Sequence, residues 1–152
     1  ALVKAFELIG TAQVAKSAME AQRDFLIINE DDTITFNKER VLFDAKQRAL
    51  GMVEGYQPPE EETFRLPGAT GRAAIDMALH DFNMKGMASD YDVHVGREVA
   101  MVLTGGDTDV TEELTERDLL KLEQKHFVAL TKQPKTLARL EHMLSTNKPL
   151  RN

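Results

Sequence analysis

Cysteine and tryptophan are both absent from this chain of 152 residues. Without cysteine the protein has no disulfide, no thiolate nucleophile and no cysteine zinc site, which fits an intracellular, cytoplasmic location. Basic residues are in deficit, because 19 Lys and Arg face 25 Asp and Glu and give a formal net charge of −6. Nucleic-acid binding depends on basic neutralisation of phosphates, so no nucleic-acid partner is expected. No apolar run approaches the roughly 20 residues of a membrane span, and no signal peptide is visible.

The hydrophobic share of 42% is that of an ordinary folded protein. The length suits one domain with its own core. We predict a mainly α fold, a bundle-like single helical domain over residues 1–152, with at most a small β ribbon near 25–36. The irregular, proline-bearing stretch 55–69 is interpreted as a crossover loop in preference to an interdomain linker. The chain opens in helical rhythm without an initiator methionine, which indicates a piece of a longer protein.

Residues 89–106 carry the pattern of a central helix. Ser89 is a good N-cap, acidic residues fill the first turn, and Gly105 and Gly106 form a good stop. Apolar residues cover most of this helix, as expected when other helices surround it. Further helices are expected at 1–9, 17–23, 37–54 and 70–85, from a cap at Thr111 or Thr115 to about 130, and from 134 onward. The expected inward faces are Val41, Leu42, Ala45, Ala49, Met52 and Val53 in one helix and Leu137, Leu140, Met143 and Leu144 in the last.

No motif carries chemistry by itself, and no catalytic residue is predicted. The four histidines fall on different predicted helices without a partner at three- or four-residue spacing, so no metal site is expected. His126 lies among leucines and is interpreted as a satisfied core histidine. The glycine-bearing stretch 68–72 precedes a helix N-terminus, but it lacks the phosphate-binding spacing and is interpreted as a turn with a cap.

Several stretches resemble the C-terminal end of bacterial multifunctional fatty-acid oxidation enzymes. They include Leu-Thr-Gly-Gly-Asp at 103–107 and the closing Lys-Pro-Leu-Arg-Asn at 148–152, which are uncommon combinations. In that family a 3-hydroxyacyl-CoA dehydrogenase comes first and a crotonase-type enoyl-CoA hydratase follows. The remaining similar stretches occur in the family's order at 5–10, 17–21, 119–123, 134–139 and 142–144.

The resemblance implies that this chain is the helical C-terminal part of a crotonase-type domain. It would support the hydratase, mediate homo-oligomerisation and contact upstream parts of the same polypeptide. NAD and acyl-CoA would belong to the parent enzyme, because the family's catalytic glutamates and nucleotide-binding glycines lie upstream of Ala1. The fragment alone is therefore expected to be inactive and to hold no cofactor.

The same resemblance implies one contact with coenzyme A. Crotonases offer a phenylalanine and, three residues later, a lysine to the nucleotide end of CoA. Phe127 matches the aromatic residue, but position 130 is leucine and the nearest lysine is Lys132. Phe127 and Lys132 are the candidate CoA-binding residues, and the competing interpretation places Phe127 in the core.

A second hypothesis is a stand-alone, acidic helical interaction module without an enzymatic parent. The two hypotheses differ in the surface that they require. An exposed apolar patch around 1–9 and 25–28 would favour the enzyme fragment. Coverage of those residues by the chain's own helices would favour the module.

Overall fold

The computed structural model describes residues 2–25, 28–29 and 31–152. The chain forms two compact units: unit 1 comprises Ala1–Ala12 and Glu62–Asn152, and unit 2 is Gln13–Glu61. The later boundary between the units falls inside the predicted loop 55–69, which is irregular at 56–62 and at 65–67. The expectation of a single domain stays a prediction. Ala1, Leu26, Ile27 and Glu30, which the sequence placed in a helix, a strand and a turn, lie outside the described residues.

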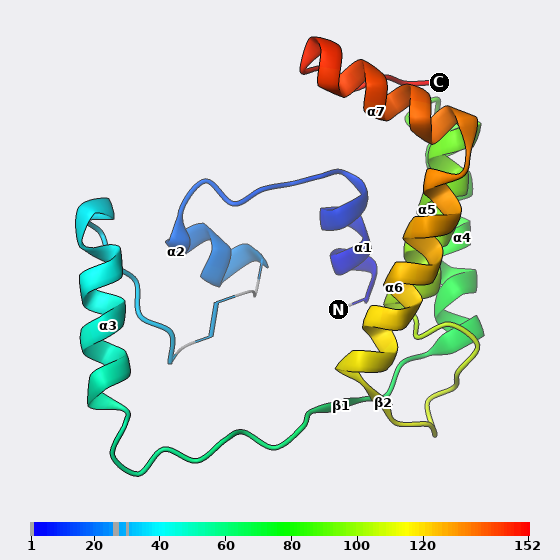
Figure 1. Cartoon of the computed structure of the whole chain (residues 1–152). Coiled ribbons are helices and arrows are strands. Elements are labelled where there is room, and N and C mark those ends of the chain that lie inside the picture. Colours follow the sequence, from blue (N-terminus) through cyan, green and yellow to red (C-terminus); the bar gives the residue numbers. More distant parts are fainter. Residues whose placement is uncertain (1, 26–27, 30) are drawn as a thin grey trace. The chain divides into compact units, whose positions relative to one another are not determined.

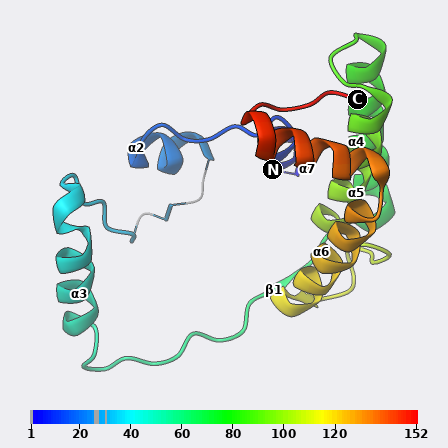
Figure 2. The same ribbon diagram turned by 45° about the horizontal axis from the view of Figure 1, so that its top comes forward.

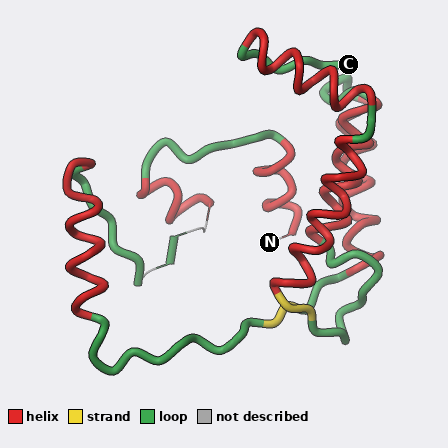
Figure 3. The backbone as a smooth tube through the Cα atoms, in the orientation of Figure 1, coloured by secondary structure: helices red, strands yellow, loops and turns green. Residues whose placement is uncertain are grey.

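The mainly α fold is confirmed, as the red segments of Figure 3 show. Within the described part of the chain, no helix is both long and apolar enough to cross a membrane. The helices of unit 1 are α1 (Leu2–Gly10), α4 (Gly68–Met84), α5 (Asp90–Leu103), α6 (Glu116–Thr131) and α7 (Pro134–Thr146). Those of unit 2 are α2 (Ala18–Glu20), the π-helical η1 (Ala21–Phe25), the 3-10 helix η2 (Lys38–Arg40) and α3 (Val41–Gly51).

The small β ribbon exists, but the predicted position near 25–36 is wrong. Strands β1 (Thr63–Phe64) and β2 (Leu114–Thr115) pair antiparallel, with Phe64 opposite Leu114. Phe25 belongs to η1, and the described residues between 28 and 36 form no strand. Four alternating residues such as 33–36 need a partner strand to become a ribbon, and the sequence pattern does not name that partner.

Helix α5 is the predicted central helix. It contacts α1, α4 and α6, and α4, α5 and α6 run side by side in both Figure 1 and Figure 2. Ser89 accepts a hydrogen bond from the Asp92 backbone at 3.1 Å, while the Asp92 carboxylate accepts one from the Ser89 backbone at 2.9 Å. Gly105 and Gly106 end the helix with φ of 83° and 69°. The predicted cap and stop are both confirmed.

The core of unit 1 lies between α1, α4 and α5. It consists of Phe6, Ile75, Leu79 and Ala100, with Leu2, Val93, Val99 and Leu103 packed around it. Gly96 brings α5 close to α4, because a Cβ at this position would lie 2.6 Å from a methyl carbon of Leu79. The missing side chain is what permits this close helix packing.

Two of the predicted inward faces are exposed. Val41 and Leu42 of α3 are exposed, as are Met52 and Val53 directly after the helix, and Leu42 retains 83% of its accessible surface. In α7 the residues Leu137, Leu140, Met143 and Leu144 are exposed, and Leu144 retains 88%. The 3.6-residue period correctly identified an apolar stripe on each helix. The period alone does not predict whether this chain also supplies the surface that covers the stripe.

Candidate functional site

The most buried ionisable pair of the described residues joins α5 and α6. Glu98 lies on α5, and His126 lies in the last turns of α6, which Thr115 starts with a capping box to Asp118. His126 Nδ1 lies 2.6 Å from Glu98 Oε2, with side-chain exposures of 11% and 23%. Because a carboxylate accepts hydrogen bonds, the Nδ1–H of His126 is the donor.

This pair has the geometry of a base and its orienting carboxylate, but it lacks access. With the proton on Nδ1, the free lone pair of the ring sits on Nε2. His126 Nε2 is buried and has no hydrogen-bond partner among the described residues. A general base must reach the proton that it abstracts, and the enclosed Nε2 of His126 has no such access in this conformation. The prediction of a satisfied core histidine is wrong on both counts, because His126 is half-buried outside the core of Phe6, Ile75, Leu79 and Ala100 and only its Nδ1 has a partner among the described residues.

The other histidines do not converge on this pair. His80 lies on α4, His94 on α5 and His142 on α7. His94 stacks on Tyr91 with ring centroids 5.5 Å apart. Among the residues that the structure describes, no group of three or more histidines and carboxylates is arranged to hold a metal ion.

One face of α6 forms a shallow, open groove with a positive rim. Lys121, Lys125 and Lys132 line it together with Gln124, Val128, Ala129 and Gln133, around about 580 Å³. Lysines at 121, 125 and 132 share a face because four and seven residues are close to whole helical turns. Lys121 also contacts Asp118 at 3.1 Å. The groove can attract a polyanion, although its open shape gives little enclosure.

The structure places the two predicted CoA-binding residues on the same helix but on different sides. Lys132 caps the C-terminal end of α6 and lines the groove, and Phe127 is not among the lining residues. Five helical residues correspond to a rotation of about 140°. Phe127 retains 64% of its accessible surface, so its interpretation as a core residue is wrong.

The glycine-bearing start of α4 is closed to an anion. Gly68 has φ of 50°, and a Cβ there would overlap the backbone carbonyl oxygen of Thr108. Arg72 donates hydrogen bonds to the Gly106 carbonyl and to Asp107. The loop 104–109 therefore covers this helix end. The interpretation of 68–72 as a turn with a cap is wrong, because these residues already belong to α4 and the N-cap residue Pro67 makes no side-chain capping hydrogen bond.

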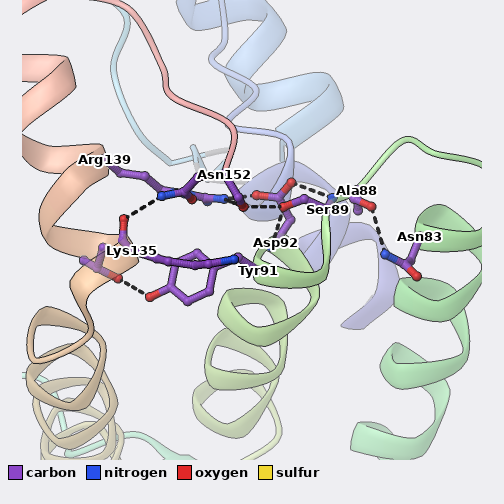
Figure 4. A network of polar contacts seen from close by, with 9 residues as sticks. Asn83, Ala88, Ser89, Tyr91, Asp92, Lys135, Arg139 and Asn152 are labelled. Atoms are coloured by element: carbon purple, nitrogen blue, oxygen red, sulfur yellow. Dashed lines mark hydrogen bonds and ion pairs between the residues drawn. The ribbon is translucent and has the colours of Figure 1, made fainter.

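A denser polar network ties the last residue of the chain to α5 and α7 (Figure 4). Asn152 accepts a hydrogen bond from Ser89 at 3.1 Å on its backbone oxygen and one from Arg139 at 2.8 Å on its side chain. Its amide donates to the Lys135 carbonyl at 3.1 Å, and Arg139 pairs with Asp92 at 2.8 Å.

Tyr91 forms the apolar centre of this network. Arg139 and Lys135 lie over its ring at 4.9 Å and 5.4 Å from the centroid, and its hydroxyl lies 2.6 Å from that of Thr136. Burial acts to raise the pKa of Asp92, but hydrogen bonds from Ser89 and Arg139 outweigh it and hold the pKa below its usual value. Because the charged groups here pair with one another, the network is a clamp that docks α7 and the C-terminal tail.

The sequence alone missed Glu98 and the lysine groove. Glu98 and His126 are separated by 28 residues on two helices, so no local spacing reveals the pair. The groove had a usable signal, because Lys121, Lys125 and Lys132 follow helical spacing on a face without aromatic residues.

Similarity to a known protein covers the whole chain. Over 153 aligned residues it is 38% identical to a protein named "Probable 3-hydroxyacyl-CoA dehydrogenase" from Bacillus subtilis (strain 168). The match takes in 100% of this chain but only 19% of that relative. The relative's name states a dehydrogenase and does not mention a hydratase or a crotonase. No protein-family model matches the chain, and no solved structure matches it.

Proposed function

We propose that this chain is the helical C-terminal region of a longer cytoplasmic enzyme of fatty-acid β-oxidation. The parent would oxidise 3-hydroxyacyl-CoA with NAD and hydrate trans-2-enoyl-CoA in a crotonase-type part. The chain would support the part that handles acyl-CoA. The observation that carries this proposal is the match along the entire chain to about a fifth of a dehydrogenase.

The surface of the chain favours this proposal over a stand-alone interaction module. Of the predicted patch around 1–9 and 25–28, Val3 and Ile9 are exposed, whereas Phe6 is buried in the core of unit 1 and Phe25 and Ile28 are half-buried. The whole apolar stripe of α3 is exposed as well. Large exposed apolar surfaces are rare on proteins that function as isolated monomers. A part of a larger enzyme would bury them against its other parts.

The isolated chain is proposed to be catalytically inactive. Crotonase chemistry requires backbone donors that stabilise a thioester oxyanion and carboxylates that move protons. The Glu98–His126 pair has its free nitrogen enclosed, and the N-terminus of α4 is covered by the Thr108 carbonyl. Neither element offers an accessible reacting group to an acyl-CoA.

A contact with the CoA nucleotide is part of the proposal. Lys132, together with Lys121 and Lys125, would attract the phosphates through the positive rim of the groove. The exposed ring of Phe127 is available for stacking on an adenine, from another side of the same helix.

Self-association is the remaining part of the proposal, and α7 supports it. Leu137, Leu140 and Leu144 recur at helical spacing and are all exposed. A two-fold contact requires a patch that is complementary to itself, and a leucine stripe meets this condition.

The deciding experiment compares the complete gene product with the 152-residue chain. We expect the coding sequence to continue upstream of Ala1, and the complete protein to reduce NAD with a 3-hydroxyacyl-CoA and to hydrate an enoyl-CoA. The 152-residue chain should do neither at equal concentration. A reading frame that starts at Ala1, or turnover by the short chain, would overturn the proposal.

The CoA contact has its own test in the complete protein. Lys132→Gln should raise the KM for an acyl-CoA and reduce its dependence on salt, whereas Lys148→Gln, at an exposed lysine in the tail, should change neither. Equal behaviour of the two variants would remove Lys132 from the substrate site. Phe127→Ala tests the ring in the same assay, and an unchanged KM would remove it as well.

A further inference from the structure

We infer that the apolar face of α3 is the docking surface for the remaining part of the same, longer polypeptide. The α3 apolar face comprises Val41, Leu42, Ala45 and Ala49 of the helix together with Met52 and Val53 directly after it, all of them exposed. This inference rests on the proposed function and names the surface through which the chain would join its parent enzyme.

One side of α3 contacts the segment that precedes the helix. Arg48 donates a hydrogen bond to the Asp31 backbone at 2.8 Å, and Thr35 donates one to Asp44 at 3.3 Å. Asp44 also pairs with Arg40 at 3.2 Å, and it is the one residue of α3 that is half-buried. The apolar residues of the helix are all exposed, Phe43 and Leu50 included. A helix in a folded protein normally turns its apolar side toward a covering partner, and the described residues of this chain supply none for the α3 apolar face.

Unit 2 also has almost no interior of its own. Among its described residues, Ala21 alone is buried, and Phe36 is almost fully exposed. Eleven helical residues are marginal in water without tertiary contacts. The regular helix over Val41–Gly51 therefore requires an outside surface that buries its apolar face.

The length of the relative indicates which partner covers the α3 apolar face. The match leaves about four fifths of the relative outside the region that corresponds to this chain. Parts of one polypeptide meet at high effective concentration, so even a modest apolar contact becomes populated. A second copy of the chain would have to bring together two α3 faces at the cost of association entropy. The remainder of the polypeptide is therefore the favoured occupant.

Thiol labelling tests this inference, because the chain has no cysteine of its own. Leu42→Cys places a thiol on the apolar face, and Gln47→Cys places the control on another exposed side of α3. Each variant is prepared in the 152-residue chain and in the complete gene product, and labelling is followed peptide by peptide with mass spectrometry.

Both positions should react at similar rates in the short chain. In the complete protein Leu42→Cys should react at least about tenfold more slowly, while Gln47→Cys stays fast. Fast labelling of Leu42→Cys in a complete protein that reduces NAD would overturn the docking surface and leave the proposed function intact. Protection of Leu42→Cys in the short chain that increases with concentration, together with a dimer in light scattering, would assign the face to a second copy. A gene without an upstream region would overturn both proposals.

Discussion

Units 1 and 2 are built from similar amphipathic helices, yet among the residues that the structure describes only those of unit 1 form a core. In unit 1, α5 is covered by α1, α4 and α6, and Ile75 retains only 1% of its accessible surface. In unit 2, α3 carries an equally regular apolar stripe whose Leu42 is 83% exposed. Helical periodicity thus produces a helix in both units. Whether the apolar side becomes a core depends on a covering partner, and in unit 2 that partner is not among the chain's own described residues.

The largest expected effect comes from shortening one apolar side chain in each unit to alanine. Ile75→Ala should lower the free energy of unfolding by about 2–5 kcal/mol, because it leaves a cavity in a closed core. Leu42→Ala in the 152-residue chain should change it by less than about 0.5 kcal/mol, as for an exposed site. Urea denaturation followed by circular dichroism measures both. A similar loss for Leu42→Ala would mean that the α3 face is already covered in the isolated chain.

Two glycines with positive φ, one in each unit, should differ in the cost of an alanine substitution. Gly68 in unit 1 and Gly55 in unit 2 have φ of 50° and 79°. Alanine at either position should cost about 1 kcal/mol for the left-handed conformation. Gly68→Ala should cost roughly 1–3 kcal/mol more, because its Cβ would overlap the Thr108 carbonyl.

Thermal melts of the two glycine variants give the difference directly. Apart from Gly55 itself and its two chain neighbours, no heavy atom lies within 4 Å of a Cβ at this position. An alanine there should therefore cost only the free energy of the left-handed backbone conformation. Equal melting temperatures would show that loop 104–109 yields to the Gly68 methyl group and does not close the α4 N-terminus firmly.

The contribution of polar side-chain pairs to the free energy of unfolding should also differ between the units, by a smaller amount. Glu98→Leu removes the acceptor of the buried His126 Nδ1–H and should cost about 1–3 kcal/mol. Replacing both residues by leucine should recover much of that loss. The exposed Arg40–Asp44 pair of α3 should contribute at most about 0.5 kcal/mol. Double-mutant cycles measure both couplings, and a coupling at Arg40–Asp44 as large as the Glu98–His126 one would contradict this difference.

The sequence predicted the helices of both units because their signals are local. Ser89 receives the predicted capping hydrogen bond at 3.1 Å, and Ser17 receives one of the same length at the start of α2. Asn37 accepts one from the Glu39 backbone at 3.0 Å. A cap depends on residues within one turn, so it can be found without knowledge of the fold.

What the sequence could not predict are the partners of each element. The ribbon at 25–36 was wrong because β1 pairs with a strand some 50 residues away, where Thr63 lies opposite Thr115. The last helix was predicted to turn its leucines inward. Instead, Arg139 and Lys135 dock α7 onto Tyr91 and turn the leucine stripe outward. In both cases, the ribbon and the last helix, the observed arrangement depends on contacts between residues that are far apart in the sequence. The candidate site shows the same limit, because Glu98 became visible only when α5 met α6.

The smallest expected effect concerns the caps of α6 and η2 in acid. Hydrogen bonds from Thr115, and then from Lys121, lower the pKa of Asp118 from 3.8 to about 2. A carboxylate whose pKa is depressed in the folded state stabilises it above the unfolded pKa, and this contribution is lost as the pH falls through the folded value. The start of α6 should therefore loosen between about pH 4 and pH 2.

The cap of η2, directly before α3, provides the contrast within the same chain. Its capping group is the Asn37 amide, which does not titrate, so this cap should keep its hydrogen bond over the same pH range. NMR titration of the Asp118 carboxyl group, with amide exchange at the starts of α6 and η2, measures both. Thr115→Val removes the largest cause of the shift and should move the Asp118 pKa back toward 3.8. If the Asp118 pKa did not change in this variant, Lys121 would be the dominant partner, and the α6 cap would respond to salt more than to Thr115.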